Sequence, residues 1–292
     1  MGDDMERTEV VVAGGGPTGL MLACELRLAG IDVVVLDRAA GRSGESRAGG
    51  LHARSLEILE HRGIAERFLS AGRRVPGGHF SGLRLDLDGL PTRYPFVLGL
   101  VQARIEALLE ERAAELGARV RWSSAVTGLT RSASHAEVTT AGGATIRAEY
   151  VVGCDGGRSA VRRLAGIAFD GTDATLTSML ADVELHQPPD GPIFQRRAPL
   201  GDFSVLRLEP GRHRLMINQY DRVVPRDAAI DFAGFRDAFV AVSGTDFGMH
   251  SPRWVSRYND AARLAASYRA GRVLLAGDAA HVHWPAGGQG LN

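Results

Sequence analysis

Near the amino terminus, two short apolar runs flank a segment whose apolar residues have a helical spacing. The β-branched run at residues 9–13 predicts a buried strand, which breaks into a run of glycines. The next apolar positions are spaced like one face of a helix: Leu20, Ala23, Leu26 and Ala29. Gly30 ends this helix, and the apolar run at 31–36 predicts a second buried strand, closed by Asp37. This order predicts a βαβ unit with parallel strands and a right-handed crossover.

Further along the chain, the pattern separates helical segments from strands. Apolar positions with a helical period predict helices at 54–69, 105–116 and 232–242. Alternation and short buried runs predict strands at 119–122, 136–140, 145–148, 150–153, 179–185, 203–208, 215–220 and 272–276. Gly142-Gly143 predicts a hairpin between the two strands that flank it.

These segments predict an α/β fold with two domains. A Rossmann-like domain with a parallel sheet, suited to a dinucleotide, would comprise residues 1–74, 101–176 and 261–292. A β-rich substrate domain would comprise residues 75–100 and 177–260. The first domain is therefore predicted to be discontinuous, because the second interrupts it twice.

Composition removes several classes of partner. Hydrophobic residues make up 45% of the 292 residues, charged residues 23%, and the formal net charge is +0. A neutral chain has no overall field that would attract nucleic acid or an anionic membrane. The apolar runs are too short to span a bilayer, and the polar segment 1–7 is not a secretory signal. Cys24 and Cys154 fall in segments predicted to be buried, so we expect a reduced, cytoplasmic protein.

The chain contains no lysine, because every residue in the Lys+Arg total is arginine. This excludes a Schiff base to pyridoxal phosphate and a P-loop, since both require a lysine. Asp278, His281 and His283 satisfy a crude count of metal ligands, but no fourth protein ligand is evident. We therefore predict no metal site.

The glycines after the first predicted strand have the spacing of a dinucleotide fingerprint. Residues 14–19 read GGGPTG and stand between a strand and a helix, the context that makes the pattern informative. Gly14 permits the tight turn, Gly16 lets a pyrophosphate approach the backbone, and Gly19 lets the helix pack on the strand. Asp37 is placed to accept hydrogen bonds from ribose hydroxyls. An acid there disfavours a 2′-phosphate, so the site suits FAD or NAD better than NADP.

Two more glycine-acid segments follow, CDGGRS at 154–159 and GDAAH at 277–281, the second continuing to PAGGQGLN at 285–292. Together with the fingerprint, their order resembles class A flavoprotein aromatic hydroxylases, and most closely the bacterial aromatic polyketide hydroxylases. Stretches at 44–47, 50–57 and 78–80 support the resemblance, which covers essentially the whole chain.

The resemblance implies that the Rossmann-like domain binds FAD. The residues expected to hold its ADP half are Gly14, Gly16, Gly19 and Asp37, and Arg38 is also expected to bind the cofactor. Arg47 would lie near the phosphates and the ribityl chain, Gln102 near the ribityl chain, and the backbone of Val126 beside the adenine. Asp155 and Gly156 would support both FAD and transiently bound NADPH.

The third segment would hold the rest of the cofactor. Gly277 and Asp278 would bind a ribityl hydroxyl or the pyrophosphate. The other carboxyl-terminal positions expected to bind FAD are Pro285, Gly287, Gly288, Gly290, Leu291 and Asn292. Backbone amides at 287–290 can stabilise negative charge on the pyrimidine edge of reduced flavin. In the family a long helix begins just after the position of Asn292, so we expect this chain to be truncated at its carboxyl end.

The resemblance also implies a reaction. NADPH would reduce FAD, O2 would form a flavin C4a-hydroperoxide, and this species would hydroxylate a phenolic or polycyclic, polyketide-like aromatic molecule. No side chain is assigned a catalytic role, because the cofactor performs the difficult step. Phe80, Phe203, Met216 and Trp254 are candidates for the substrate pocket, with ordinary core packing as the alternative. The only protein partner expected is a second copy of the chain or a complementing carboxyl-terminal polypeptide.

Three alternatives stay open or are weakened at this point. A flavin halogenase is disfavoured because it needs a lysine near the flavin. A non-catalytic or partner-dependent FAD-binding fragment remains the alternative function. The arginines at 158, 162 and 163 form a basic cluster beside the second segment, or else a solvated surface with ion pairs.

Overall fold

The computed structural model describes residues 5–42, 44, 48–80, 83–191, 193–220, 222–225 and 228–292. Contacts divide the chain into two compact units, one comprising Met1–Asp170 with Arg263–Asn292, and the other Gly171–Ala262. Within the part of the chain that the structure describes, no helix is long and apolar enough to cross a membrane.

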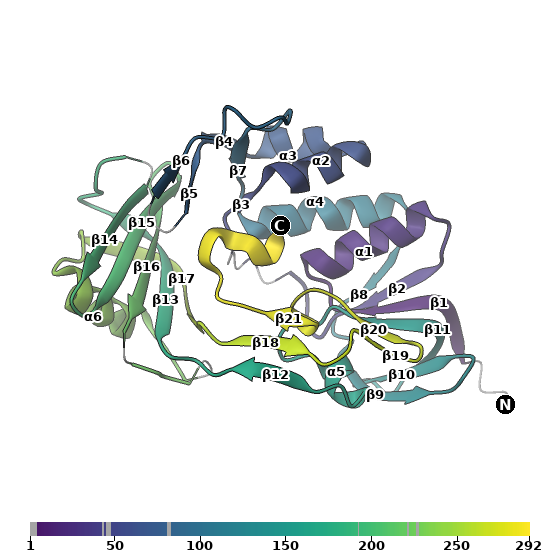
Figure 1. Ribbon diagram of the computed structural model, residues 1–292. Helices are drawn as coiled ribbons and strands as arrows, with labels where there is room; N and C mark the ends of the chain where they lie inside the picture. The colour runs from purple at the N-terminus through teal and green to yellow at the C-terminus, as the bar shows by residue number, and fades with distance from the viewer. Residues whose placement is uncertain are drawn as a thin grey trace. The chain divides into compact units, whose positions relative to one another are not determined.

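The first unit is built on a sheet whose central strands are parallel (Figure 1). The strands are β20 (Val273–Leu275), β11 (Thr145–Gly153), β1 (Glu6–Ala13), β2 (Val33–Leu36) and β8 (Arg119–Arg121), in that order. β19 (Arg269–Ala270) adds an antiparallel edge strand, and the hairpin of β9 (Val126–Arg131) and β10 (Ala136–Thr140) pairs with β11. The strands predicted at 145–148 and 150–153 are one strand, β11, which pairs with β1 from Ile146 to Gly153.

Alternating side chains bury both faces of this sheet, as expected for a parallel sheet. On one face, Val10, Val12 and Val33 pack with Ala23 of α1 (Pro17–Leu28), and α4 (Gln102–Glu115) lies beside α1. On the other face, the alternate residues of the same strands pack with the β9–β10 hairpin and with Val161 of α5 (Ala160–Leu164). The predicted βαβ unit of β1, α1 and β2 is confirmed.

A second cluster surrounds α4. It contains α2 (Ala53–His61), α3 (Ala65–Ala71) and a sheet in the order β3 (Gly50–Leu51), β7 (Phe96–Gly99), β4 (Arg73–Pro76). The periodicity predicts one helix over 54–69, whereas the structure has two, because Gly63 lies between them at φ +68°. β5 (Gly78–Phe80) and β6 (Leu83–Leu85) form a separate hairpin.

The position of residues 75–100 differs from the sequence interpretation. The pattern predicts that they belong to the β-rich domain, whereas the contacts place them in the first unit. The reason is burial, since Leu98 of β7 is fully buried in the same cluster as Leu56 and Phe68. The functional domain boundaries as a whole remain a prediction.

The second unit is an antiparallel sheet with one helix. Its strands, in spatial order, are β14 (Ile193–Ala198), β15 (Gly201–Glu209), β16 (Arg212–Gln219), β13 (Thr177–Leu185) and β17 (Met249–Asn259). Asp231 caps α6 (Phe232–Ser243) by accepting the Gly234 N–H at 2.8 Å, and Gly244 ends it at φ +77°. The sequence pattern misses β17, because its residues are mostly half-buried and do not alternate clearly.

α6 covers one face of this sheet. Phe235 and Phe239 are fully buried, and the rings of Phe239 and Phe203 are 5.4 Å apart between centroids. Phe203 is therefore a core residue of the second unit. His213 lies on β16 and is also buried, and neither of its ring nitrogens has a hydrogen-bond partner among the described residues.

Short elements complete the chain. β12 (Phe169–Thr172) and β18 (Ala262–Ala265), where the chain passes between the units, form a small sheet with β21 (His281–Val282). The carboxyl-terminal glycine-rich segment contains two 3-10 helices, η1 (Gly277–Ala279) and η2 (Ala286–Leu291).

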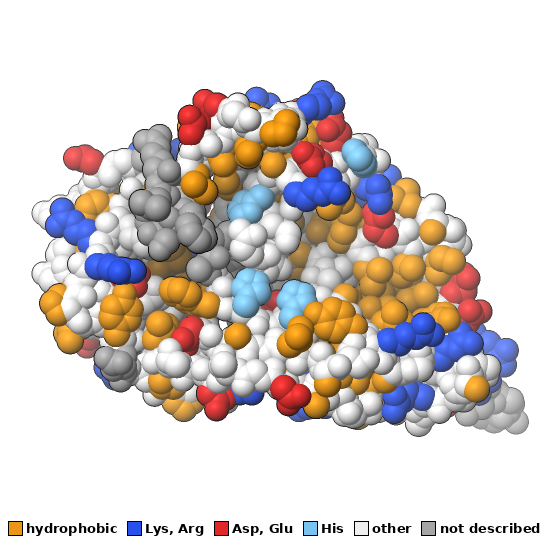
Figure 2. Space-filling view, viewed as in Figure 1, with side chains coloured by type: hydrophobic (Ala, Val, Ile, Leu, Met, Phe, Trp, Pro, Cys, Tyr) orange, Lys and Arg blue, Asp and Glu red, His pale blue; other side chains and the backbone are white. Residues whose placement is uncertain are grey.

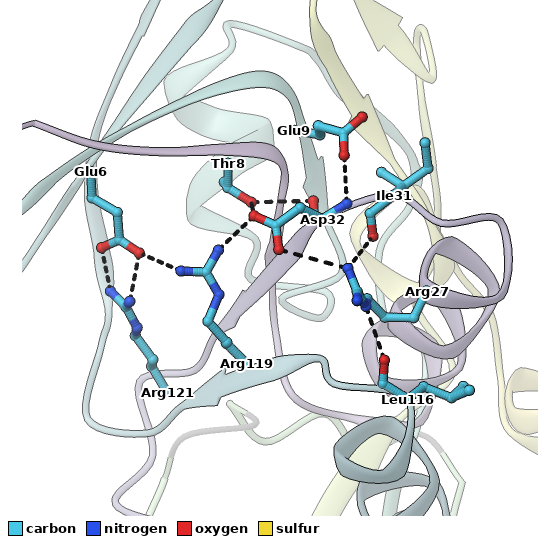
Figure 3. A network of polar contacts seen from close by, with 9 residues as sticks. All are labelled: Glu6, Thr8, Glu9, Arg27, Ile31, Asp32, Leu116, Arg119 and Arg121. Atoms are coloured by element: carbon cyan, nitrogen blue, oxygen red, sulfur yellow. Dashed lines mark hydrogen bonds and ion pairs between the residues drawn. The ribbon is translucent and has the colours of Figure 1, made fainter.

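A polar network joins β1, β2 and β8 of the first unit (Figure 3). Glu6 accepts two hydrogen bonds from Arg121, at 2.6 and 2.7 Å, and one from Arg119 at 3.0 Å. Arg119 also donates to Asp32 at 2.7 Å, and Thr8 donates to the same carboxylate at 2.8 Å. The bonds from Arg121 lower the pKa of Glu6. The network ties together segments far apart in the sequence, near the amino ends of β1 and β2.

Candidate FAD-binding site

The three glycine-acid segments meet in the first unit, at the carboxyl ends of adjacent parallel strands. The Gly14 N–H donates to the Leu36 carbonyl at 2.7 Å, and the Cys154 N–H donates to the Ala13 carbonyl at 2.7 Å. The Ala276 N–H donates to the Gly153 carbonyl at 2.9 Å. This edge of an α/β sheet is where such folds bind ligands.

Close contacts explain three of the glycines. A Cβ on Gly14, which has φ +112°, would lie 2.3 Å from the Cys154 carbonyl oxygen. A Cβ on Gly19 would lie 1.9 Å from the Gly14 carbonyl oxygen, and one on Gly277 would lie 2.6 Å from Thr18 Oγ1. These glycines let the first segment pack directly against the second and the third.

Gly16 differs from its neighbours. Among the described residues, no heavy atom outside its chain neighbours lies within 4 Å of the position that a Cβ on Gly16 would take. Gly16 is the N-cap of α1, no side chain caps the helix there, and Pro17 opens its first turn. The first turn of α1 therefore begins at a residue without a side chain, with open space at its Cβ position, which suits a pyrophosphate.

Asp37 is held in place by backbone amides. Its Oδ2 accepts the Gly15 N–H at 2.6 Å, and its Oδ1 accepts the Ala39 N–H at 2.8 Å. The Asp37 side chain is thus oriented beside the fingerprint, with lone pairs left for ribose hydroxyls. Arg38 is exposed, and Val126 is half-buried at the start of β9.

Gln102 fastens the next segment to α4. Its Oε1 accepts the Ala48 N–H at 3.2 Å, and its Nε2 donates to Glu106 at 2.8 Å. Burial raises the pKa of Glu106. Arg47, one residue before Ala48, lies outside the described residues.

Asp155 has one engaged and one unengaged oxygen. Its Oδ2 accepts the Ala160 and Val161 N–H groups at 2.6 and 3.2 Å, at the start of α5. Its Oδ1 is buried and has no hydrogen-bond partner among the described residues. The adjacent Gly156 has φ +80° and open space around its Cβ position. A buried oxygen without a partner is costly, and a ligand hydroxyl or amide would satisfy it.

Arg162 is neither a surface residue nor part of a solvated cluster. It is 5% exposed, and its guanidinium donates to the Ala279 carbonyl at 2.8 Å and to the Gly157 carbonyl at 2.9 Å. The same group lies 3.6 Å from the centroid of the Phe169 ring. Arg162 therefore joins the second segment to the third, whereas Arg163 is exposed.

The carboxyl-terminal segment folds back onto the first unit. Asn292 accepts hydrogen bonds from the His52 N–H at 2.7 Å and the Ser55 hydroxyl at 2.9 Å. Leu291 packs against the cluster around α4. Asp278 is exposed, and its Oδ1 lies 3.9 Å from the position of a Cβ on Gly290. Within η2, Gly287 precedes Gly288, which has φ +67° and donates its N–H to the exposed Pro285 carbonyl.

These observations fit FAD. The space at Gly16 can take the pyrophosphate, Asp37 can accept ribose hydroxyls, and Asp155 Oδ1 needs a donor. The model of the family described as "FAD binding domain" matches residues 7–292. The chain belongs to this family.

The chain is similar to several enzymes. It is 44% identical to a rifampicin monooxygenase of Streptomyces venezuelae, over 97% of this chain and 61% of the relative. The structure of anhydrotetracycline hydroxylase from Streptomyces rimosus is 45% identical, with a TM-score of 0.90 over 98% of this chain and 59% of that one. A Diels-Alderase of pyrroindomycin biosynthesis is 38% identical, with a TM-score of 0.88 over 97% and 62%. The FAD-binding chain spans about three fifths of the length of the curated relatives it matches.

Sequence reasoning missed two groups beside the site. Trp122 follows β8, and its Cη2 would lie 3.2 Å from a Cβ on Gly15. Arg42 pairs with Glu110 of α4 at 2.8 Å. Neither residue belongs to a glycine-acid segment, so no motif identifies them.

The two cysteines are buried, as predicted. Burial raises the pKa of Cys24 to about 11 and that of Cys154 to about 12. Both therefore stay protonated near neutral pH and are poor nucleophiles.

Proposed function

We propose that this protein is an FAD-dependent monooxygenase that uses NADPH and O2 to hydroxylate a phenolic or polycyclic aromatic small molecule. The observation that carries the proposal is the convergence of the three segments around the open backbone at Gly16. The similarity to anhydrotetracycline and rifampicin monooxygenases supports the reaction class.

Several residues would bind the cofactor and hold it in position. The first-turn amides of α1 would bind the pyrophosphate, and Asp37 would accept the adenosine ribose hydroxyls. The Oδ1 atom of Asp155 would accept a hydrogen bond from FAD or NADPH. The backbone amides of η2 would lie toward the flavin ring. When bound and reduced, the flavin supplies the chemistry that activates O2 for transfer to an electron-rich ring.

We propose that the aromatic substrate binds at the sheet of the second unit. On the face opposite α6, one polar row contains Ser178, Asn218 and Asp202, joined by hydrogen bonds of 2.6 and 2.8 Å. A second row contains the buried ion pair of Arg214 with Asp182 at 2.8 Å. The rows are four residues apart on β13, about 14 Å at the rise of an extended strand.

Apolar side chains lie between these rows. Leu180 pairs with Met216 across β13 and β16, and both fall on the same face as the polar rows. Trp254 borders the second row and donates to Asp182 at 2.9 Å. Burial raises the pKa of Tyr258 to about 12, so its phenol stays neutral beside the first row. Leu180 is buried, whereas Met216 and Trp254 are half-buried, so a flat ring system with oxygen substituents at its edges would reach this face at Met216 and Trp254.

The test uses the purified chain with FAD, NADPH and a panel of phenolic polycyclic compounds. We expect a yellow protein whose NADPH oxidation rises when a substrate is added. The product should gain one oxygen atom from labelled O2, as measured by mass spectrometry. Gly16→Val is the matched control, because it fills the pyrophosphate space and should remove both FAD and turnover.

Two results would contradict the proposal. The first is a folded protein that takes up no FAD. The second is a flavoprotein that never oxidises NADPH with any aromatic compound, a result expected of a non-oxidative enzyme or a binding module on the same fold.

A further inference from the structure

Trp122 lies beside the central glycine of the fingerprint. Its Cη2 lies 3.2 Å from the position of a Cβ on Gly15, and the Asp37 Cβ lies 3.3 Å from the same point. Gly15 donates its N–H to Asp37, the residue proposed to hold the adenosine ribose. The side chains of Trp122 and Asp37 therefore lie next to each other beside Gly15.

The indole has a fixed orientation. Its Nε1 donates to Glu110 Oε1 at 3.1 Å, and Glu110 Oε2 pairs with Arg42 Nε at 2.8 Å. Trp122 itself is half-buried, so part of the side chain is open to solvent. A tryptophan held by its polar edge presents the other edge of the ring at a defined place.

The backbone after the indole is unusual. Ser123 is not glycine, yet it has φ +54°, a left-handed conformation that L-residues adopt only rarely. Its N–H donates to the Ala39 carbonyl at 2.7 Å, and the Ser124 N–H donates to the Asp37 carbonyl at 2.6 Å. The turn thus wraps around the backbone of residues 37–39 and keeps Trp122 beside the acid.

We propose that Trp122 is a cofactor-contacting residue whose indole flanks the adenosine of FAD beside Asp37. The inference rests on the proposed function, because it assumes that Asp37 and the fingerprint hold the ADP half of FAD. In this arrangement Glu110 and Arg42 act as positioning residues, since they hold the ring and do not themselves touch the cofactor.

Fluorescence tests whether ADP binding reaches the environment of Trp122. The chain has three tryptophans, so Trp254→Phe with Trp284→Phe leaves Trp122 as the only indole. ADP is the probe because it does not absorb tryptophan emission, so a change in emission requires contact or a local rearrangement. We expect ADP, at concentrations that displace FAD, to quench or shift the emission of this variant. Trp122→Phe, with the other two indoles intact, should show no change.

Affinity provides a second readout. Trp122→Ala should weaken binding of ADP and FAD by the same factor, about tenfold, the scale of one lost aromatic contact with a base. Trp122→Phe should recover most of that loss, because it keeps a ring, and FMN, which lacks the adenosine, should bind all variants equally. Circular dichroism checks that each variant is folded. If Trp122→Ala does not fold, the single-tryptophan measurement still decides the question.

The outcomes separate this inference from the proposed function. If ADP displaces FAD without altering Trp122 emission, or if Trp122→Ala leaves both affinities unchanged, the inference is overturned while the FAD site stands. If ADP does not compete with FAD, the adenosine is not held here and the inference also fails. A folded wild-type protein that binds neither ligand would overturn the proposed function as well.

Discussion

Arg162 offers a direct test of how the second and third segments are held together. Arg162→Met keeps an apolar stem but loses the guanidinium, and with it the contact over the Phe169 ring and the hydrogen bonds to the Gly157 and Ala279 carbonyls. A hydrogen bond from a charged donor contributes about 1.5–3 kcal/mol, so the two together contribute about 3–6 kcal/mol. Burial lowers the pKa of Arg162, because the charged guanidinium is removed from water. Replacing the arginine by methionine removes this desolvation cost, which offsets part of the loss. We expect a net loss of about 2–4 kcal/mol in the free energy of unfolding.

Urea unfolding followed by circular dichroism measures this loss. Arg163→Met is the matched control, since Arg163 is the exposed neighbour on the same helix and its loss should change stability by less than about 0.5 kcal/mol. Arg162→Lys should fall between wild type and Arg162→Met, because a single ammonium cannot reproduce the planar fork that reaches both carbonyls. Equal unfolding midpoints for Arg162→Met and Arg163→Met would refute the assignment of Arg162 as the link between the segments.

Substitutions at two glycines should separate folding from cofactor binding. Gly14→Ala places its Cβ 2.3 Å from the Cys154 carbonyl oxygen and should lower the free energy of unfolding by more than about 2 kcal/mol. Gly16→Ala should instead fold normally and bind FAD more weakly. Thermal unfolding and flavin titration measure the two effects, and the reverse pattern would contradict the site. Asp37→Ala should weaken FAD by about 1–3 kcal/mol in the same titration, and an unchanged affinity would remove Asp37 from the site. Burial lowers the pKa of His213 below its unfolded value of about 6.5, so the folded chain favours the neutral ring and loses stability as the pH falls below that value. His213→Leu should therefore show a smaller change in unfolding midpoint than wild type between pH 7 and 5, and parallel curves would rule out this origin.

The local features of the site could be predicted from the sequence. The fingerprint at 14–19 follows a β-branched run and opens a helix, and both signals depend only on neighbouring residues. Gly14 and Gly277 adopt positive φ, at +112° and +59°, the conformations that make glycine informative in a sequence. Strands with clear alternation, such as β16, could also be predicted from the sequence. β17 could not, because its residues are mostly half-buried and their burial does not alternate.

Residues without a local signature could not be predicted. Arg162 resembles any arginine in a basic cluster, and only the packing of η1 against α5 makes it a buried link between two segments. Trp122 stands outside every motif, and its contact with Gly15 depends on the adjacency of β8 to β2. Residues 75–100 contain ordinary strand signals, and their place in the first unit follows from the burial of Leu98.

The amino-acid sequence by itself determined the βαβ beginning, the glycine positions and the family resemblance, because each depends on residue type and short spacing. The tertiary structure decided which carbonyls meet Arg162, which oxygen of Asp155 lacks a partner, and which indole lies beside Asp37. These features join residues up to 117 positions apart in the chain. Contacts of that kind are set by strand order and helix packing, which no local pattern encodes.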